Sequence, residues 1–138
     1  MANRGSPKQF TVEQANATLP LVRRIVQDIV TQYRAWNEKL YEIDLVAASG
    51  RAADNDVADR LAAEAQSLAR EIEGFRRELA DLGIEMKDPG IGLIDFPSTM
   101  GSRPIYLCWR LGESDVGFWH EIHAGYAGRQ PLIPESVA

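Results

Sequence analysis

The stretch that decides the fold is residues 15–47, ANATLPLVRRIVQDIVTQYRAWNEKLYEIDLVA. Its apolar residues recur at alternating spacings of four and three positions. They are Ala15, Leu19, Val22, Val26, Ile29, Tyr33, Trp36, Leu40, Ile43 and Ala47. This spacing is typical of a coiled-coil seam, so it predicts a long helix with an apolar stripe that must pack on a partner.

The ends of this helix are also marked in the sequence. Thr11 and Gln14 have the spacing of a capping box, which predicts a helix that begins near residue 11. Pro20 removes one backbone donor, so we expect a kink there, or a short helix followed by a new start capped by Thr18. The pattern fades near residue 48, where Gly50 can terminate the helix. At 1.5 Å per residue, about 37 residues span roughly 55 Å.

A second apolar series with the same alternation follows a turn-rich segment at 49–56. Its members are Leu61, Ala65, Leu68, Ile72, Phe75, Leu79 and Leu82. Asp54, Asn55 or Asp56 can cap this second helix, and Gly83 can end it. Two long helices with a short connection predict an antiparallel hairpin. A hairpin alone leaves apolar surface exposed, so we expect a homodimer formed through the helices.

The pattern changes from helix to strand after residue 83. Residues 84–92 read as a loop because they are rich in Pro, Gly and Asp. Three runs with strand-like composition follow at 93–97, 103–111 and 116–123, separated by turn-forming residues. The fold class is therefore α+β: a long antiparallel helical hairpin, a three-stranded antiparallel β-meander and an irregular tail. We expect residues 1–9 to be disordered and residues 10–138 to form one domain, with the hairpin at 10–83 and the meander and tail at 84–138.

Composition excludes several classes of protein. The 138 residues carry a net charge of −5, which disfavours a nucleic-acid-binding protein because phosphate contacts need a basic face. No run approaches the roughly 18 apolar residues of a membrane span, and the N-terminal residues do not resemble a signal peptide. A single cysteine cannot form an internal disulfide bond. We therefore expect a cytoplasmic protein that contacts neither nucleic acid nor membrane.

Residues 103–132, RPIYLCWRLGESDVGFWHEIHAGYAGRQPL, hold the scarce reactive side chains of the chain. They contain the single cysteine, Cys108, and both histidines, His120 and His123. Side chains alternate across a strand, so a turn that sets Leu111 opposite Phe118 would place His123 on the same face as Cys108. That polar face would hold Asp95, Tyr106, Cys108, Arg110, Trp119, Glu121 and His123, whereas the apolar face would take His120.

Thiol, imidazole and carboxylate groups together suggest a metal centre. We expect its ligands to be drawn from Cys108, Glu121, His123 and His120, with Asp95 or Glu113 as further candidates. This mixed S, N and O set suits zinc or iron more than magnesium. A bound small ligand would be oriented by Asp95, Tyr106, Arg110, Glu113 and Arg129. A helical reading would bring the two histidines onto one face, but the residue pattern favours a strand.

Each of these residues also has a purely structural interpretation. Cys108 can be a small packed apolar residue, His120 a hydrogen-bonded core residue, and Glu121 a cross-strand ion-pair partner of Arg110. A nucleophilic pair of Cys108 with a histidine is a further alternative. The alternative function is therefore a structural or interaction protein that dimerises through its heptad helices without catalysis. The sequence names no reaction, so it does not decide whether the protein is an enzyme.

Several motifs together resemble the bacterial family DUF2203. They are Phe10-Thr-Val-Glu-Gln-Ala-Asn16, Lys87-Asp88, Gly92-Leu-Ile-Asp-Phe-Pro97, Tyr106-Leu-Cys-Trp-Arg-Leu-Gly-Glu113, Trp119-His-Glu121 and Gly125-Tyr-Ala-Gly-Arg-Gln-Pro131. The resemblance covers nearly the whole chain but implies no activity. It does mark a set of residues as part of the family pattern: Asp95, Cys108, Glu113, His120, Glu121, Arg129 and Gln130.

Overall fold

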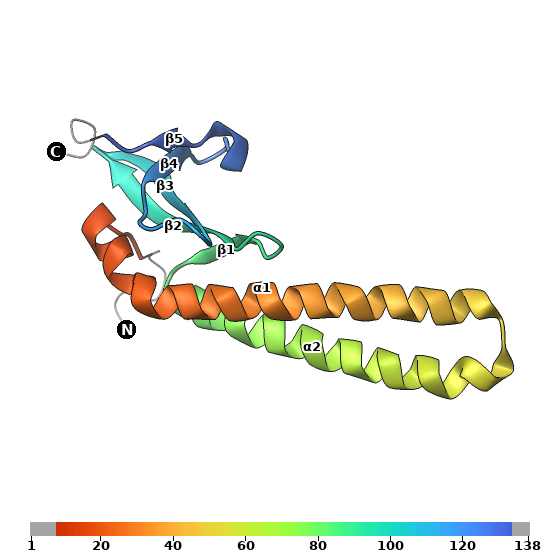
Figure 1. The fold of residues 1–138 in the computed structure, drawn as a ribbon. Helices are drawn as coiled ribbons and strands as arrows, with labels where there is room; N and C mark the ends of the chain where they lie inside the picture. Colours follow the sequence, from red (N-terminus) through yellow and green to blue (C-terminus); the bar gives the residue numbers. More distant parts are fainter. Residues whose placement is uncertain (1–7, 134–138) are drawn as a thin grey trace.

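The computed structural model describes residues 8–133, which form two long helices followed by a sheet. Helix α1 spans Val12–Ser49, and helix α2 spans Asn55–Asp81 after a short 3-10 turn, η1, at Ala52–Asp54. The helices run side by side in opposite directions, which confirms the predicted hairpin (Figure 1). Disorder is expected for residues 1–9. Of these, residues 1–7 lie outside the described residues.

The predicted start of α1 is confirmed in atomic detail. The Thr11 hydroxyl accepts the Gln14 backbone N–H at 3.0 Å, and the Gln14 side chain accepts the Thr11 backbone N–H at 3.0 Å. Pro20 lies inside a continuous helix, and Thr18 donates to the Ala15 carbonyl instead of capping a new helix. Figure 1 shows the first turns of α1 bent away from the remainder, in agreement with the expected kink. Gly50, at φ 67°, ends the helix.

The sheet has five strands, so the prediction of three is wrong. They are β1 (Glu85–Asp88), β2 (Leu93–Met100), β3 (Arg103–Arg110), β4 (Phe118–Glu121) and β5 (Gln130–Pro131), paired antiparallel in chain order. The two additional strands are the edges of the sheet. β1 is mostly charged, and β5 is two residues long and contains a proline, so neither carries the apolar alternation of a strand.

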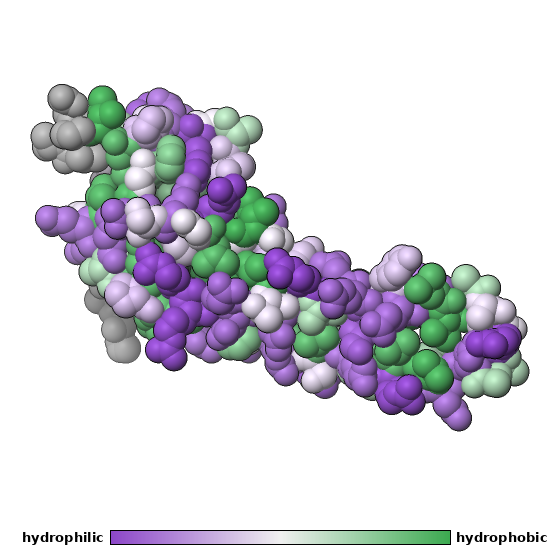
Figure 2. All heavy atoms as spheres, viewed as in Figure 1, coloured by the Kyte–Doolittle hydropathy of each residue, from purple (hydrophilic) through white to green (hydrophobic). Residues whose placement is uncertain are grey.

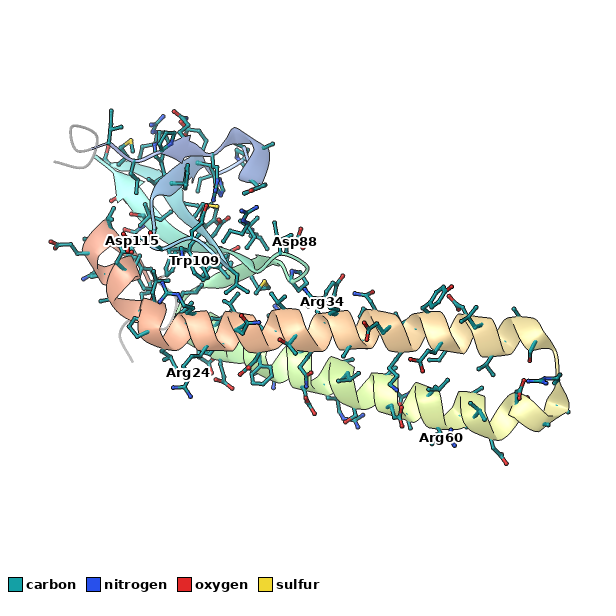
Figure 3. All side chains as sticks on the ribbon, viewed as in Figure 1. Arg24, Arg34, Arg60, Asp88, Trp109 and Asp115 are labelled. Carbon is teal, nitrogen blue, oxygen red and sulfur yellow. The ribbon has the colours of Figure 1, made fainter. Side chains whose placement is uncertain are left out.

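The core lies between one face of the sheet and the first half of α1. The Phe10 and Phe96 rings meet edge to face, with centroids 5.2 Å apart, and Trp109 lies fully buried between sheet and helix (Figure 3). The buried set comprises Phe10, Ala15, Leu19, Val22, Ile25, Val26, Ile29, Val30, Leu79, Ile84, Ile94, Phe96, Ile105, Leu107, Trp109, Val116 and Trp119. This packing fixes the orientation of the sheet, and so turns its second face away from the helices.

The far half of the hairpin has much less buried surface. In α2, Leu61 and Ala65 are buried there, while Tyr33 and Trp36 of α1 are only half-buried. Leu40 is 36% exposed and Leu45 54% exposed. Figure 2 shows apolar side chains gathered at this end of the hairpin on the visible face. Apolar residues of α1 therefore remain exposed in this half, where the single chain does not cover them.

The register of β4 corrects the predicted arrangement of the two faces. Cys108 lies opposite Phe118, and Tyr106 lies opposite His120, which is three residues from the expected pairing. An odd shift exchanges the faces of a strand, so His120 joins Cys108 while Trp119 enters the core. The shift in register arises in the segment between β3 and β4. This segment forms a broad loop, in which the buried Val116 donates its N–H to Asn16 of α1 at 2.7 Å.

The two helices show no membrane-spanning character in the part of the chain that is described. Neither contains a sufficiently long apolar window with few charges.

Candidate metal centre

Three potential metal ligands meet on the face of the sheet that points away from the helices. Asp95 comes from β2, Cys108 from β3 and His120 from β4, three neighbouring strands. One donor atom from each side chain lies within 4.8 Å of the other two. The residues are 2%, 0% and 2% exposed, respectively. A buried cluster of one carboxylate, one thiol and one imidazole is therefore built into the centre of the sheet.

The His120 ring is held at both nitrogens. Its Nδ1 lies 2.7 Å from the Glu121 carbonyl oxygen, which can only accept, so Nδ1 carries a proton. Its Nε2 lies 3.0 Å from Asp95 Oδ2, a distance that requires one shared proton for a hydrogen bond. A histidine that ligates a metal usually donates its other ring N–H to such a carbonyl. The Glu121 backbone therefore presets the tautomer in which Nε2 is the donor atom for a metal.

Asp95 is an unusual residue for the middle of this strand. Its chain neighbours Ile94 and Phe96 are fully buried, and burial of Asp95 raises the pKa of its carboxyl, with the His120 hydrogen bond acting in the opposite direction. Oδ1 accepts no hydrogen bond of ordinary geometry among residues 8–133, although a contact with the Cys108 thiol also lowers the pKa of this carboxyl. An unsatisfied buried polar atom costs about 1–3 kcal/mol. A positively charged ligand at this point would remove that cost.

Cys108 is a protonated thiol in the metal-free protein at neutral pH. Burial raises the pKa of the thiol to about 11, and a contact from Arg129 only partly opposes this. Arg129 Nη1 donates to Cys108 Sγ at 3.7 Å. A metal ion bound at the sulfur would favour the thiolate, and the positive charge of the Arg129 guanidinium would add to this effect.

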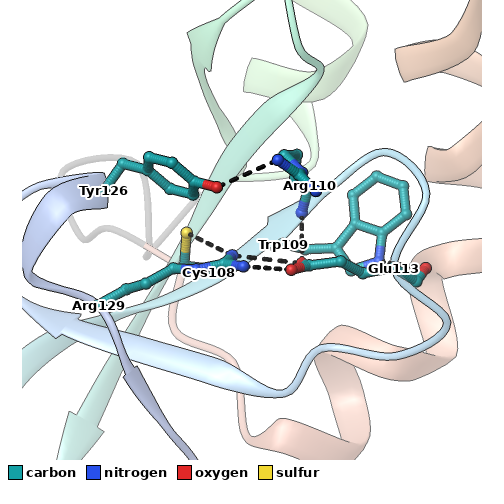
Figure 4. Close-up of polar contacts among 6 residues, drawn as sticks. All are labelled: Cys108, Trp109, Arg110, Glu113, Tyr126 and Arg129. Carbon is teal, nitrogen blue, oxygen red and sulfur yellow. Dashed lines mark hydrogen bonds and ion pairs between the residues drawn. The ribbon is translucent and has the colours of Figure 1, made fainter.

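Arg129 is itself fixed in place by several contacts (Figure 4). It forms a two-pronged ion pair with Glu113, whose Oε1 also accepts the Arg110 backbone N–H at 2.8 Å. The guanidinium lies 3.8 Å from the ring centroid of Phe118 and 4.8 Å from that of Tyr126. These contacts hold the C-terminal segment, including the 3-10 turn η2 at Tyr126–Gly128, across the face that carries Cys108.

A cavity of about 300 Å³ opens beside the buried cluster. Asp95 and His120 are among the residues that line it, and much of its wall is apolar or aromatic: Leu93, Tyr106, Ile122 and Tyr126. The Tyr106 ring lies 5.5 Å from the His120 ring, and its hydroxyl donates to Glu85 at 2.8 Å. Molecules of limited size can therefore approach the Asp95 and His120 side of the cluster.

The structure brings some of the expected site residues together and separates others. Cys108 and His120, expected as metal ligands, do lie together, and Asp95, expected to contact a small ligand, lies with them. Tyr106 lines the cavity, while Arg110, Glu113 and Arg129 form the neighbouring network. The other two expected ligands lie elsewhere. They are Glu121, which pairs with Arg103 at 2.9 Å on the opposite side of the sheet, and His123, which lies in an exposed turn.

The pairing of Asp95 with His120 is the feature that the sequence interpretation missed. The run Leu93-Ile-Asp-Phe96 contains the signal, because a carboxylate between buried apolar residues needs a partner. A turn that sets Leu111 opposite Phe118 places His120 on the other face, whereas the observed pairing of Phe118 is with Cys108.

Comparison with known proteins identifies the family but adds no chemistry. The family described as "Uncharacterized conserved protein (DUF2203)" matches residues 8–132, which include every residue of the cluster and its surroundings. Neither the curated proteins nor the solved structures gave a match. Since the match spans most of the chain, the protein belongs to the DUF2203 family.

Proposed function

We propose that the domain binds one divalent metal ion through Asp95, Cys108 and His120. The observation that carries this proposal is the convergence of three different donor atoms within 4.8 Å on a buried sheet face. The unsatisfied Asp95 Oδ1 and the preset His120 tautomer support it independently. A mixed sulfur, nitrogen and oxygen set suits zinc or iron(II), whereas magnesium and calcium prefer oxygen ligands alone.

A cysteine nucleophile fits this geometry less well than a metal ligand. A nucleophilic thiol needs a lowered pKa, but burial raises that of Cys108 to about 11. Both nitrogens of His120 are already engaged, one by Asp95 and one by the Glu121 carbonyl, so neither is free to accept the thiol proton. Deprotonation by a metal ion avoids both obstacles, because the metal replaces the protons that the ligands carry.

A cobalt(II) titration tests the metal proposal directly. Purified apoprotein should bind one equivalent of cobalt and develop a thiolate-to-cobalt charge-transfer band, which reports the sulfur ligand. Cys108→Ser should abolish the band. His120→Gln should weaken cobalt binding by well over the roughly 10–100-fold that is typical of losing a residue that only orients a ligand.

The chain supplies a matched control for the histidine variant. His123 is exposed and does not belong to the cluster of Asp95, Cys108 and His120. His123→Gln should therefore bind cobalt as the unmodified protein does. Equal weakening in both histidine variants, or a band that survives Cys108→Ser, would contradict the assignment. Far-ultraviolet circular dichroism of each apo variant separates lost binding from lost folding.

We also propose that two copies of the chain pair through their hairpins. The supporting observation is the apolar surface of the far half, where Tyr41 is 63% and Leu45 is 54% exposed. Leu40, 36% exposed, extends this apolar surface, and a second copy presents the same surface in a symmetric dimer. Sedimentation equilibrium should give twice the chain mass, and Leu45→Lys should shift the equilibrium toward the monomer. A monomer at tens of micromolar would contradict the pairing.

A further inference from the structure

We propose that the cavity beside the cluster binds small carboxylic acids with an apolar or aromatic body, whose carboxylate coordinates the metal. This inference rests on the metal site proposed above. Only three ligand side chains converge among the described residues, and three protein ligands leave a fourth position open on a tetrahedral ion. Asp95 and His120 both line the cavity, so the open position is reached from there.

The walls of the cavity select the body of the ligand. Leu93 is buried, and Ile122 and Tyr126 are 38% and 39% exposed at the mouth, where they can cover apolar atoms of a bound molecule. The volume of about 300 Å³ lies at the lower end of the usual range for ligand sites, which is roughly 300–1,000 Å³. A single aromatic ring or a short aliphatic chain therefore fits.

The metal and one cation, Lys87, would hold the head of the ligand. With a divalent ion bound, the carboxylate of Asp95 and the thiolate of Cys108 balance the charge of the metal, so a carboxylate in the fourth position needs a further cation. Lys87 lines the cavity, and its ion pair with Glu85, at 2.9 Å, is well exposed and therefore weak. Asp88, the acidic residue at the rim, accepts the Gly90 backbone N–H at 2.9 Å.

Cobalt-loaded protein provides the test, with benzoate, acetate and benzyl alcohol as probes. Benzoate should alter the visible cobalt spectrum at saturation. It should bind about tenfold more tightly than acetate, because burial of the ring contributes at least that much. Benzyl alcohol has the ring but no carboxylate, so it should leave the spectrum unchanged at equal concentration.

A substitution at the mouth tests the location. Ile122→Trp enlarges a side chain of the cavity wall that is not a proposed metal ligand, so it should keep the cobalt charge-transfer band and weaken benzoate about tenfold. Leu21→Trp, at a 52% exposed position on α1, is the matched control and should bind benzoate normally.

The possible results separate the two proposals. A charge-transfer band with no benzoate response, equal affinities for acetate and benzoate, an equal response to benzyl alcohol, or unchanged benzoate binding in Ile122→Trp would each overturn the cavity proposal alone. Absence of the cobalt band in the unmodified protein would overturn the metal site and the cavity proposal together. The comparison of the three probes on unmodified protein stands even if the Ile122 variant does not fold.

Discussion

The substitution Gly92→Ala tests whether the sheet is seated on α1 as described. Gly92 precedes β2, the strand that carries Asp95, and has a φ of 70°. A Cβ built at this position lies 2.7 Å from Leu111 Cβ and 2.8 Å from Val26 Cγ1. Both distances are shorter than a side chain can tolerate, so α1 or the sheet must move.

The expected cost has two parts that a second glycine can separate. A non-glycine residue in the left-handed region costs about 1–3 kcal/mol, and overpacking a well-packed core adds about 1–3 kcal/mol. Gly101, in the turn between β2 and β3, has a φ of 64°, but its added Cβ has no described atom within 4 Å. Gly101→Ala should therefore show only the backbone cost, and Gly92→Ala should exceed it by about 1–3 kcal/mol.

Urea unfolding of both metal-free variants, followed by tryptophan fluorescence and far-ultraviolet circular dichroism, measures the difference. The unfolding free energies should fall in the order unmodified protein, Gly101→Ala, Gly92→Ala, with similar m-values. Equal losses for the two alanine variants would refute the close approach of sheet and helix at residue 92. The placement of the site relative to the hairpin would then need revision.

Three further outcomes are expected. Metal affinity should fall by at least about tenfold for each unit of decreasing pH between pH 9 and 6. The reason is that binding must release the thiol proton of Cys108, whose pKa burial raises to about 11. Isothermal titration at several pH values measures this dependence, and a pH-independent affinity would exclude thiolate ligation. Asp95→Asn should keep or raise the stability of the apoprotein by about 1 kcal/mol, because the amide can donate to His120 without a buried charge. The same variant should lose the stabilisation of about 2.7 kcal/mol that zinc at 100 times its Kd gives the unmodified protein; an unchanged zinc-induced rise in Tm would argue against Asp95 as a ligand. Gly74→Ala, at an open position within α2, should raise the unfolding free energy by about 1 kcal/mol in urea titrations, and destabilisation would indicate an unrecognised contact there.

The helical part of the fold could be predicted because its determinants are local in sequence. The capping box at Thr11, the 4-3 spacing of apolar residues and the glycine at residue 50 each act within a few positions. The extent of burial could not be predicted in the same way. Leu19 and Leu40 occupy equivalent seam positions, but only Leu19 lies where the sheet covers α1.

The sheet was less predictable because its register depends on contacts between distant segments. Asn16 binds the backbone of Val116 across 100 positions of sequence, which sets the path of the loop before β4. The residues of the loop alone do not reveal that contact, and a turn that pairs Leu111 with Phe118 places each residue of β4 on the opposite face from the one observed. The grouping of Cys108 with Asp95 was predicted correctly, since the short turn between β2 and β3 has no such tether.

The most direct test of the metal site is X-ray absorption at the zinc edge of protein loaded with one equivalent of zinc. A zinc ion held by Asp95, Cys108 and His120 should show one sulfur at about 2.3 Å and nitrogen or oxygen neighbours at about 2.0–2.2 Å. The sulfur contribution should disappear in Cys108→Ser and persist in His123→Gln. A zinc shell made only of nitrogen and oxygen in the unmodified protein would contradict the central claim that Asp95, Cys108 and His120 form a metal centre.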